Sequence, residues 1–316
     1  MLRKDIKPVS PVDRLVAARE VLANSIARNT DQEGQITSAI PALTLYRFEA
    51  PTQPVVAMYE PSIAMIAQGA KRVLLGDATY VHVAHSFLIT SIDLPTATQV
   101  IEASPEKPYL SLLLKLDMGE VAQLMADSDL PPPPAQPSSR GMAISEASLP
   151  LLNAFQRLID LLDEPKDIPI LAPVIQREIL YRLIVGDQGL RLRHIGSVGS
   201  QSHQIARAID WMKEHFSQPL RMDDLAARFN MSISTFHHHF RALTAVSPLQ
   251  FQKRLRLHEA RRLMISENLD AAGAAFKVGY ESPSQFSREY SRLFREPPLR
   301  DVTKLRQKAG PALTSR

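Results

Sequence analysis

The chain repeats a segment of itself at a spacing of 50 residues, and this repeat constrains the fold more than any other sequence feature. Residues 231–250 (MSISTFHHHFRALTAVSPLQ) align with residues 281–300 (ESPSQFSREYSRLFREPPLR), with six of twenty positions identical. Phe236 and Phe240 share one helical stripe, and the second copy repeats their spacing with aromatic residues. The repeat therefore predicts two copies of one helical unit, each with an aromatic stripe packed inward.

A short helix is predicted ahead of each copy, over residues 223–229 and 271–276. Ser232 and Ser282 are natural N-caps for the helices that follow, and Pro283 occupies the favoured first helical position. A helix, a tight turn and a second capped helix form the helix-turn-helix pattern, whose second helix enters the major groove of DNA.

The outer faces of the two second helices are the expected sites of base recognition, because residues at i, i+3 and i+4 share one patch. The predicted base-contacting residues are Ser234, His237 and His238 in the first copy and Ser284, Ser287 and Arg288 in the second. Arg288 is suited to bidentate contact with guanine. Phosphate contacts, which hold register without reading sequence, are predicted for Arg241, Lys253, Arg254, Arg292 and Arg295.

Between the copies, residues 247–265 predict one long helix that begins at Ser247 and Pro248. Such a helix could hold the two units about 34 Å apart, which is one turn of DNA. Its cations are expected to lie near the DNA backbone, and they are Lys253, Arg254, Arg256, Arg261 and Arg262.

The distribution of charge separates the first part of the chain from the part that holds the repeat. Residues 1–186 carry 16 Lys and Arg against 21 Asp and Glu, a net charge of −5, whereas residues 187–316 carry 21 against 12, a net charge of +9. A basic C-terminal module suits a polyanionic partner.

Residues 204–301 resemble the DNA-binding domain of the AraC/XylS family in three segments. These are LAARFNMSISTFHHHF, RLRLHEARRLM, and VGYESPSQFSREYSRLF followed by Pro297 and Pro298. The resemblance implies seven helices, the first over 203–216. The chain departs from the family in the run from His237 to His239, and in Gly273, which costs about 1 kcal/mol in a helix relative to alanine.

The front half predicts a small antiparallel β-barrel or sandwich. Residues 41–116 hold short runs rich in Val, Ile, Leu, Tyr and Thr, and Gly76-Asp77 lies between two of them like a hairpin turn. Through PSIAMIAQGAKRVLLGDATY and FLITSIDLP this half resembles the cupin-like N-terminal domain of the same family, which implies a small-molecule effector and a homodimer.

Two amphipathic helices are predicted after the strands. A proline run at 131–134 is expected as an extended loop, and Ser145 is the expected N-cap of the first helix. The apolar stripes are Leu149, Leu152, Phe155, Ile159 and Leu162, then Leu171, Ile175, Ile179 and Leu183. These stripes could cover the barrel or form a dimer interface. Four glycines within 186–202 predict a flexible linker.

The predicted fold class is therefore α+β, with a cupin-like β-barrel and helical cover followed by an all-α domain. The expected division is an N-terminal arm or helix (1–35), an effector-sensing and dimerisation domain (36–186), a linker (187–202), a double helix-turn-helix domain (203–302) and a tail (303–316).

No set of residues predicts catalysis, a metal site or a cofactor. The chain lacks a Gly-rich phosphate loop, GxSxG and HExxH. Three consecutive helical histidines, His237 to His239, point about 100° apart and cannot close on one ion. His82 and His85 lack the His-X-His and glutamate of a metal cupin, which favours a buried or rim histidine.

The sequence thus predicts a DNA-binding transcriptional regulator without enzymatic activity. Expected partners are double-stranded DNA, a small-molecule effector, a second copy of the chain and RNA polymerase; activation and repression stay open. A cupin-type enzyme fused to a helical nucleic-acid-binding domain is the alternative, and an RNA-binding or scaffold protein is another. Zero cysteines, no signal peptide and no apolar run of about 18 residues lead us to expect a cytoplasmic protein.

Overall fold

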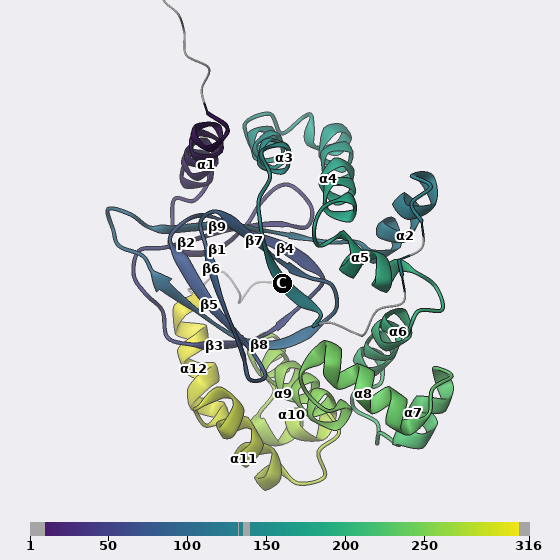
Figure 1. Ribbon diagram of the computed structural model, residues 1–316. Coiled ribbons are helices and arrows are strands. Elements are labelled where there is room, and N and C mark those ends of the chain that lie inside the picture. Colours follow the sequence, from purple (N-terminus) through teal and green to yellow (C-terminus); the bar gives the residue numbers. More distant parts are fainter. Residues whose placement is uncertain (1–9, 132, 135–139, 310–316) are drawn as a thin grey trace, which may run out of the picture.

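Figure 1 shows the computed structural model, which describes residues 10–131, 133–134 and 140–309. Two antiparallel sheets lie at its centre, α1, α3 and α4 lie beyond one sheet, and α9 to α12 lie beyond the other. The N-terminal helices and strands and the C-terminal helices confirm the predicted α+β class. Pro132 and residues 135–139 of the predicted proline-rich loop lie outside the described residues.

The two sheets pack face to face as a barrel. The first has the order β1-β2-β9-β4-β7-β10 and the second β3-β8-β5-β6. The strands are β1 (Gly34–Thr37), β2 (Leu43–Phe48), β3 (Val55–Tyr59), β4 (Ser62–Gln68), β5 (Ala70–Leu75), β6 (Ala78–Val83), β7 (Ser86–Thr90), β8 (Leu94–Glu102), β9 (Tyr109–Lys115) and β10 (Met142–Glu146). The predicted hairpin is confirmed, because Leu75 pairs with Ala78 across Gly76, which has a φ of +58°.

Three helices cover the outer face of the six-stranded sheet: α1 (Pro11–Arg28), α3 (Leu149–Asp160) and α4 (Ile168–Val185). Phe155, Ile159, Ile179 and Leu183, from the predicted stripes, are buried in one core with Leu112 of β9. These apolar faces therefore cover the barrel. The short helix η1 (Leu161–Asp163) separates α3 from α4.

The prediction that Ser145 is the N-cap of the first helix after the strands is wrong. Ser145 pairs with Phe87 inside the β10·β7 ladder. The N-cap of α3 is Ser148, three residues later, and Pro150 lies in the first turn of this helix. Pairing with a distant strand therefore overrides the local capping preference of Ser145.

The glycine-containing segment 186–202 also differs from the flexible linker that the sequence predicts. It holds α5 (Gly189–Gly196), which packs on α2 (Met118–Asp127). Leu192 and Ile195 of α5 are buried, and their burial explains why a segment with four glycines is helical.

The C-terminal part, from residue 201 to 309, contains seven helices among the described residues, the number that the family resemblance implies. They are α6 (Gln201–Glu214), α7 (Met222–Arg228), α8 (Ile233–Thr244), α9 (Pro248–Ser266), α10 (Ala271–Lys277), α11 (Pro283–Phe294) and α12 (Pro298–Ala309). None of the described helices could span a membrane.

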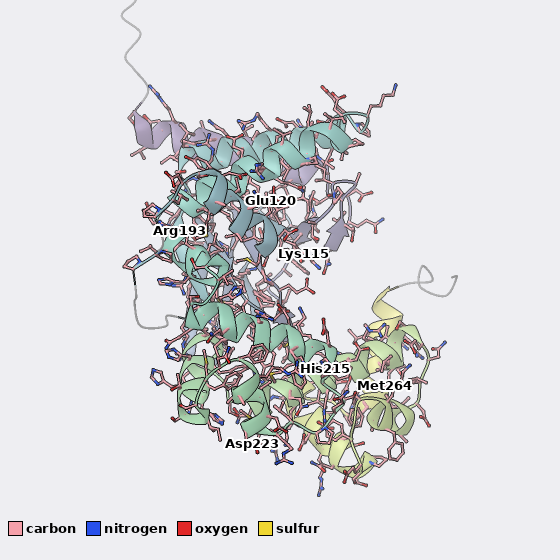
Figure 2. All side chains as sticks on the ribbon, turned by 90° about the vertical axis from the view of Figure 1, so that its right-hand side faces the viewer. Lys115, Glu120, Arg193, His215, Asp223 and Met264 are labelled. Atoms are coloured by element: carbon pink, nitrogen blue, oxygen red, sulfur yellow. The ribbon has the colours of Figure 1, made fainter. Side chains whose placement is uncertain are left out.

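We call residues 10–196 the barrel half and residues 201–309 the helical half. Figure 2 shows Lys115 and Glu120 on the barrel half and His215, Asp223 and Met264 on the helical half. One hydrophobic core continues across the junction, since Leu75 and Leu94 of the barrel pack in the same cluster as Ile209 of α6 and Phe240 of α8. An ion pair between Lys213 and buried Asp93, 2.9 Å long, also joins the halves.

Candidate DNA interface

The structure confirms a helix, a tight turn and a second capped helix in both copies of the repeat. In the first copy, Asn230 adopts a φ of +53° between α7 and α8, and the Ser232 hydroxyl accepts a hydrogen bond from the Thr235 amide. In the second, Gly279 adopts a φ of +88° between α10 and α11, and the Ser282 hydroxyl accepts one from the Gln285 amide.

The second helices of the two units, α8 and α11, are shifted in the chain by the 50 residues of the repeat. Each ends with a residue in the left-handed conformation, Ala245 at a φ of +66° and Arg295 at +65°. Each is followed by a helix that begins with proline, Pro248 in α9 and Pro298 in α12. The repeat is therefore structural as well as sequential.

The predicted inward aromatic stripe is confirmed. Phe236 and Phe240 of α8 and Phe286 and Tyr290 of α11 are all fully buried. The Tyr290 hydroxyl donates to Asp301 Oδ2 (2.6 Å), and the same carboxylate accepts two hydrogen bonds from the guanidinium of Arg261. Packing of the aromatic stripes leaves the opposite face of each helix available to solvent.

The predicted base-contacting residues lie on those opposite faces. Ser234, His238, Ser284 and Arg288 are exposed, and His237 and Ser287 are half-buried. The first patch also contains a ring contact between His238 and His239. The structure thus brings the residues of each predicted patch together on one helix.

Arg288 has no ion pair among the described residues. Its neighbour Glu289 instead binds Lys253 Nζ (2.8 Å) and accepts hydrogen bonds from the Tyr280 hydroxyl (2.8 Å) and Gln285 Nε2 (3.2 Å). These three partners occupy the carboxylate of Glu289, the acidic residue that follows Arg288 in the chain.

The five residues predicted to contact phosphates lie in two places. Arg241 is exposed near the end of α8. Lys253, Arg254, Arg292 and Arg295 line a cleft of about 1180 Å³ between β3 and β8 of the barrel and α9, α11 and α12. Arg254 Nη1 donates to the Pro95 carbonyl of β8 (3.1 Å), and this bond holds the side chain at the junction of the halves.

Three cations of the basic face of α9 have partners within the helical half. Arg256 donates to the carbonyls of Phe216, Ser217, Gln218 and Gly279, Arg261 pairs with Asp301, and Arg262 pairs with Glu259. Because of these contacts, most of the positive charge of α9 stabilises the helical half itself. Sequence reasoning missed this role, since the partners of Arg256 lie up to 40 residues away.

A cluster of polar side chains lies inside the barrel. Lys71 Nζ lies 5.6 Å from the centre of the Tyr59 ring and interacts with the phenols of Tyr46 and Tyr109. His82, the cross-strand partner of Lys71, is fully buried, and its Nε2 bonds the Ser86 carbonyl while its Nδ1 has no partner among the described residues. Burial, with a smaller contribution from Lys71, lowers the pKa of His82 to about 3, so the imidazole is neutral.

Comparison with known proteins gives a family for both halves. Residues 39–191 match the family model described as "AraC-type transcriptional regulator N-terminus", and residues 225–302 match the model described as "Helix-turn-helix domain". The fold is shared with ToxT from Vibrio cholerae O395, at a TM-score of 0.58 and 12% identity, over 83% of this chain and 98% of that chain.

Curated relatives align with part of the chain. The HTH-type transcriptional activator RhaS of Klebsiella pneumoniae (strain 342) is 28% identical over 132 residues, 41% of this chain and 46% of that protein. RhaS of Escherichia coli O1:K1 / APEC is 27% identical over 143 residues, 44% of this chain and 49% of that protein. The chain thus spans about half the length of these relatives. With both of its halves matched, the chain belongs to the AraC/XylS family of transcriptional regulators.

Proposed function

We propose that this chain is a sequence-specific, double-stranded-DNA-binding transcriptional regulator that acts by binding and not by catalysis. The observation that carries the proposal is the pair of capped helices α8 and α11, whose aromatic faces are buried and whose outer faces present polar side chains. Two such helices in one chain can read two major-groove segments about one turn of DNA apart.

Within this function, Ser234, His237, His238, Ser284, Ser287 and Arg288 contact bases, and Arg241, Lys253, Arg254, Arg292 and Arg295 contact phosphates. We keep residues 36–186 as the sensing domain, 187–202 as its connection and 203–302 as the DNA-binding domain. Contact with RNA polymerase stays a prediction.

Selection of binding sites from random double-stranded DNA with the full chain tests the proposal. We expect enrichment of one sequence motif, and binding to that motif should fall steeply with salt because phosphate contacts release counterions. Equal retention of selected and scrambled duplexes at every salt concentration would contradict it.

We assign the effector site to the barrel interior around Lys71. The ammonium lies among three phenols and a neutral His82, and no described carboxylate forms an ion pair with it. A charge removed from water is costly unless it is paired, so an acidic effector would stabilise this cluster. ToxT structures carry acids of this kind, an unsaturated fatty acid and a substituted butenoic acid.

A panel of carboxylic acids and their methyl esters, scored by the melting temperature of the full chain, tests the effector site. We expect at least one acid, and not its ester, to raise the melting temperature of the wild type and to leave that of Lys71→Met unchanged. Equal shifts in wild type and Lys71→Met would place the effector elsewhere.

We assign homodimerisation to the outer face of α4, because the stripes predicted from the sequence, with the exception of Leu171, pack toward the barrel. Five apolar side chains remain exposed on this helix, namely Ile170, Leu171, Val174, Tyr181 and Val185. An exposed apolar stripe of this kind is typical of an interface. Sedimentation at tens of micromolar should show a wild-type dimer and a Val174→Glu monomer; a wild-type monomer would refute the assignment.

A further inference from the structure

A hollow of about 610 Å³ lies where the barrel half meets the first recognition helix, α8. It is lined by Arg140, His237, His238, Arg241, Ala242 and Ser247. Two guanidinium groups and two imidazoles thus face one space, and none of the described residues that line it is acidic. Arg140 comes from the barrel half, in the segment that leads into β10, whereas the other five come from α8 and the turn after it.

Hydrogen bonds fix Arg140 on the end of α8. Its Nη1 donates to the carbonyl of Arg241 (2.8 Å) and to the carbonyl of Ala242 (3.2 Å). The neighbouring Gly141 amide donates to the Leu243 carbonyl (2.9 Å). Because the described contacts of Arg140 use only Nη1, Nε and Nη2 remain to donate to a further acceptor.

The position of Arg140 also changes the electrostatics of this end of α8. The C-terminal carbonyls of a helix carry partial negative charge, which disfavours an approaching anion. A guanidinium on these carbonyls offsets that charge, and Arg241 adds a second cation beside it. Planar guanidinium groups bind phosphate oxygens in a bidentate manner, and imidazole N–H groups can donate as well.

We propose that Arg140 and Arg241 together bind one phosphate of the DNA backbone, so that the DNA interface extends from the helix-turn-helix onto the barrel half. The inference rests on the proposed DNA-binding function, because the hollow adjoins the base-facing patch of His237 and His238. Under this proposal, Arg140 of the barrel half belongs to the DNA-binding surface because the barrel is docked on α8.

The salt dependence of DNA binding by the full chain tests the proposal. Each phosphate contact contributes about 0.9 to the slope of log K against log salt, so Arg140→Gln should reduce that slope by about 1. The loss of affinity should be about equal for all duplex sequences, since a phosphate contact carries no base information. Lys166→Gln is the matched control, because Lys166 is exposed in the loop before α4, beyond the opposite face of the barrel.

Arg140→Lys separates charge from helix capping. Lysine keeps the cation, so we expect this variant to retain the wild-type slope even if its melting temperature falls. A wild-type slope in Arg140→Gln would overturn the proposal, as would an equal loss of slope in Arg140→Gln and Arg140→Lys. If the wild type itself shows no specific binding, the proposed function fails instead, and the two failures are therefore distinguishable.

Discussion

Gly279, in the turn of the second helix-turn-helix, has no room for a side chain. A Cβ at this position would lie 2.1 Å from the Ser217 carbonyl oxygen, and the φ of +88° is one that L residues rarely adopt. The loop that holds Ser217 cannot easily retreat, because Arg256 binds the carbonyls of Phe216, Ser217 and Gln218. A left-handed alanine costs about 1–2 kcal/mol, and overpacking adds about 1–3 kcal/mol.

Gly279→Ala should therefore lower the free energy of unfolding of the helical half by about 2–5 kcal/mol. Gly199→Ala is a matched control, because Gly199 has a similar φ of +87° but no heavy atom lies within 4 Å of the place that an alanine methyl would take. In this variant only the conformational cost of about 1–2 kcal/mol applies. Fluorescence of Trp211, the single tryptophan, follows the helical half in urea. Equal midpoint shifts in the two variants would refute the steric argument.

Three further predictions address the interface and the two cores. Arg288→Ala should cost about 1–3 kcal/mol in DNA binding and relax preference at one base pair, whereas Arg241→Ala should weaken all duplexes about equally, as fluorescence anisotropy on single-base variants would show. The pKa of His82 is about 3 in the folded chain, whereas an unfolded histidine has a pKa near 6.5, so the chain should lose stability as the pH falls from 6.5 toward 3. The loss in unfolding free energy should be about 2 kcal/mol at pH 5, and urea titrations should show that His82→Gln removes it. Tyr290→Phe, which deletes the hydrogen bond to Asp301, should cost about 1.5–3 kcal/mol of unfolding free energy by the same tryptophan assay.

Local signals made the helical half predictable from the sequence. The serine caps at 232 and 282 and the aromatic spacing of Phe236 and Phe240 depend only on neighbours within one or two turns, and the structure keeps them. The strand at 62–68 was predictable for the same reason, because residues 63–67 are an uninterrupted apolar run and Gly69 follows the strand.

Features set by distant partners were not predictable. Strand β10, at 142–146, forms because it pairs with β7, about 55 residues earlier, and it displaces the expected cap at Ser145. The segment around Leu192 is helical because tertiary burial outweighs its glycines. An arginine such as Arg256 looks the same in sequence whether it meets DNA or a carbonyl of its own chain, and only the fold decides between them.

Both helix-turn-helix units read DNA sequence in the function that we propose. Its most direct test is the affinity of the full chain, by fluorescence anisotropy, for a selected duplex and for two duplexes of equal length in which one half of the site or the other is scrambled. The two-unit account predicts half-sites about 10–10.5 base pairs apart and a loss of affinity when either half is scrambled. Unchanged affinity after scrambling one half, or equal binding to all three duplexes, would contradict it.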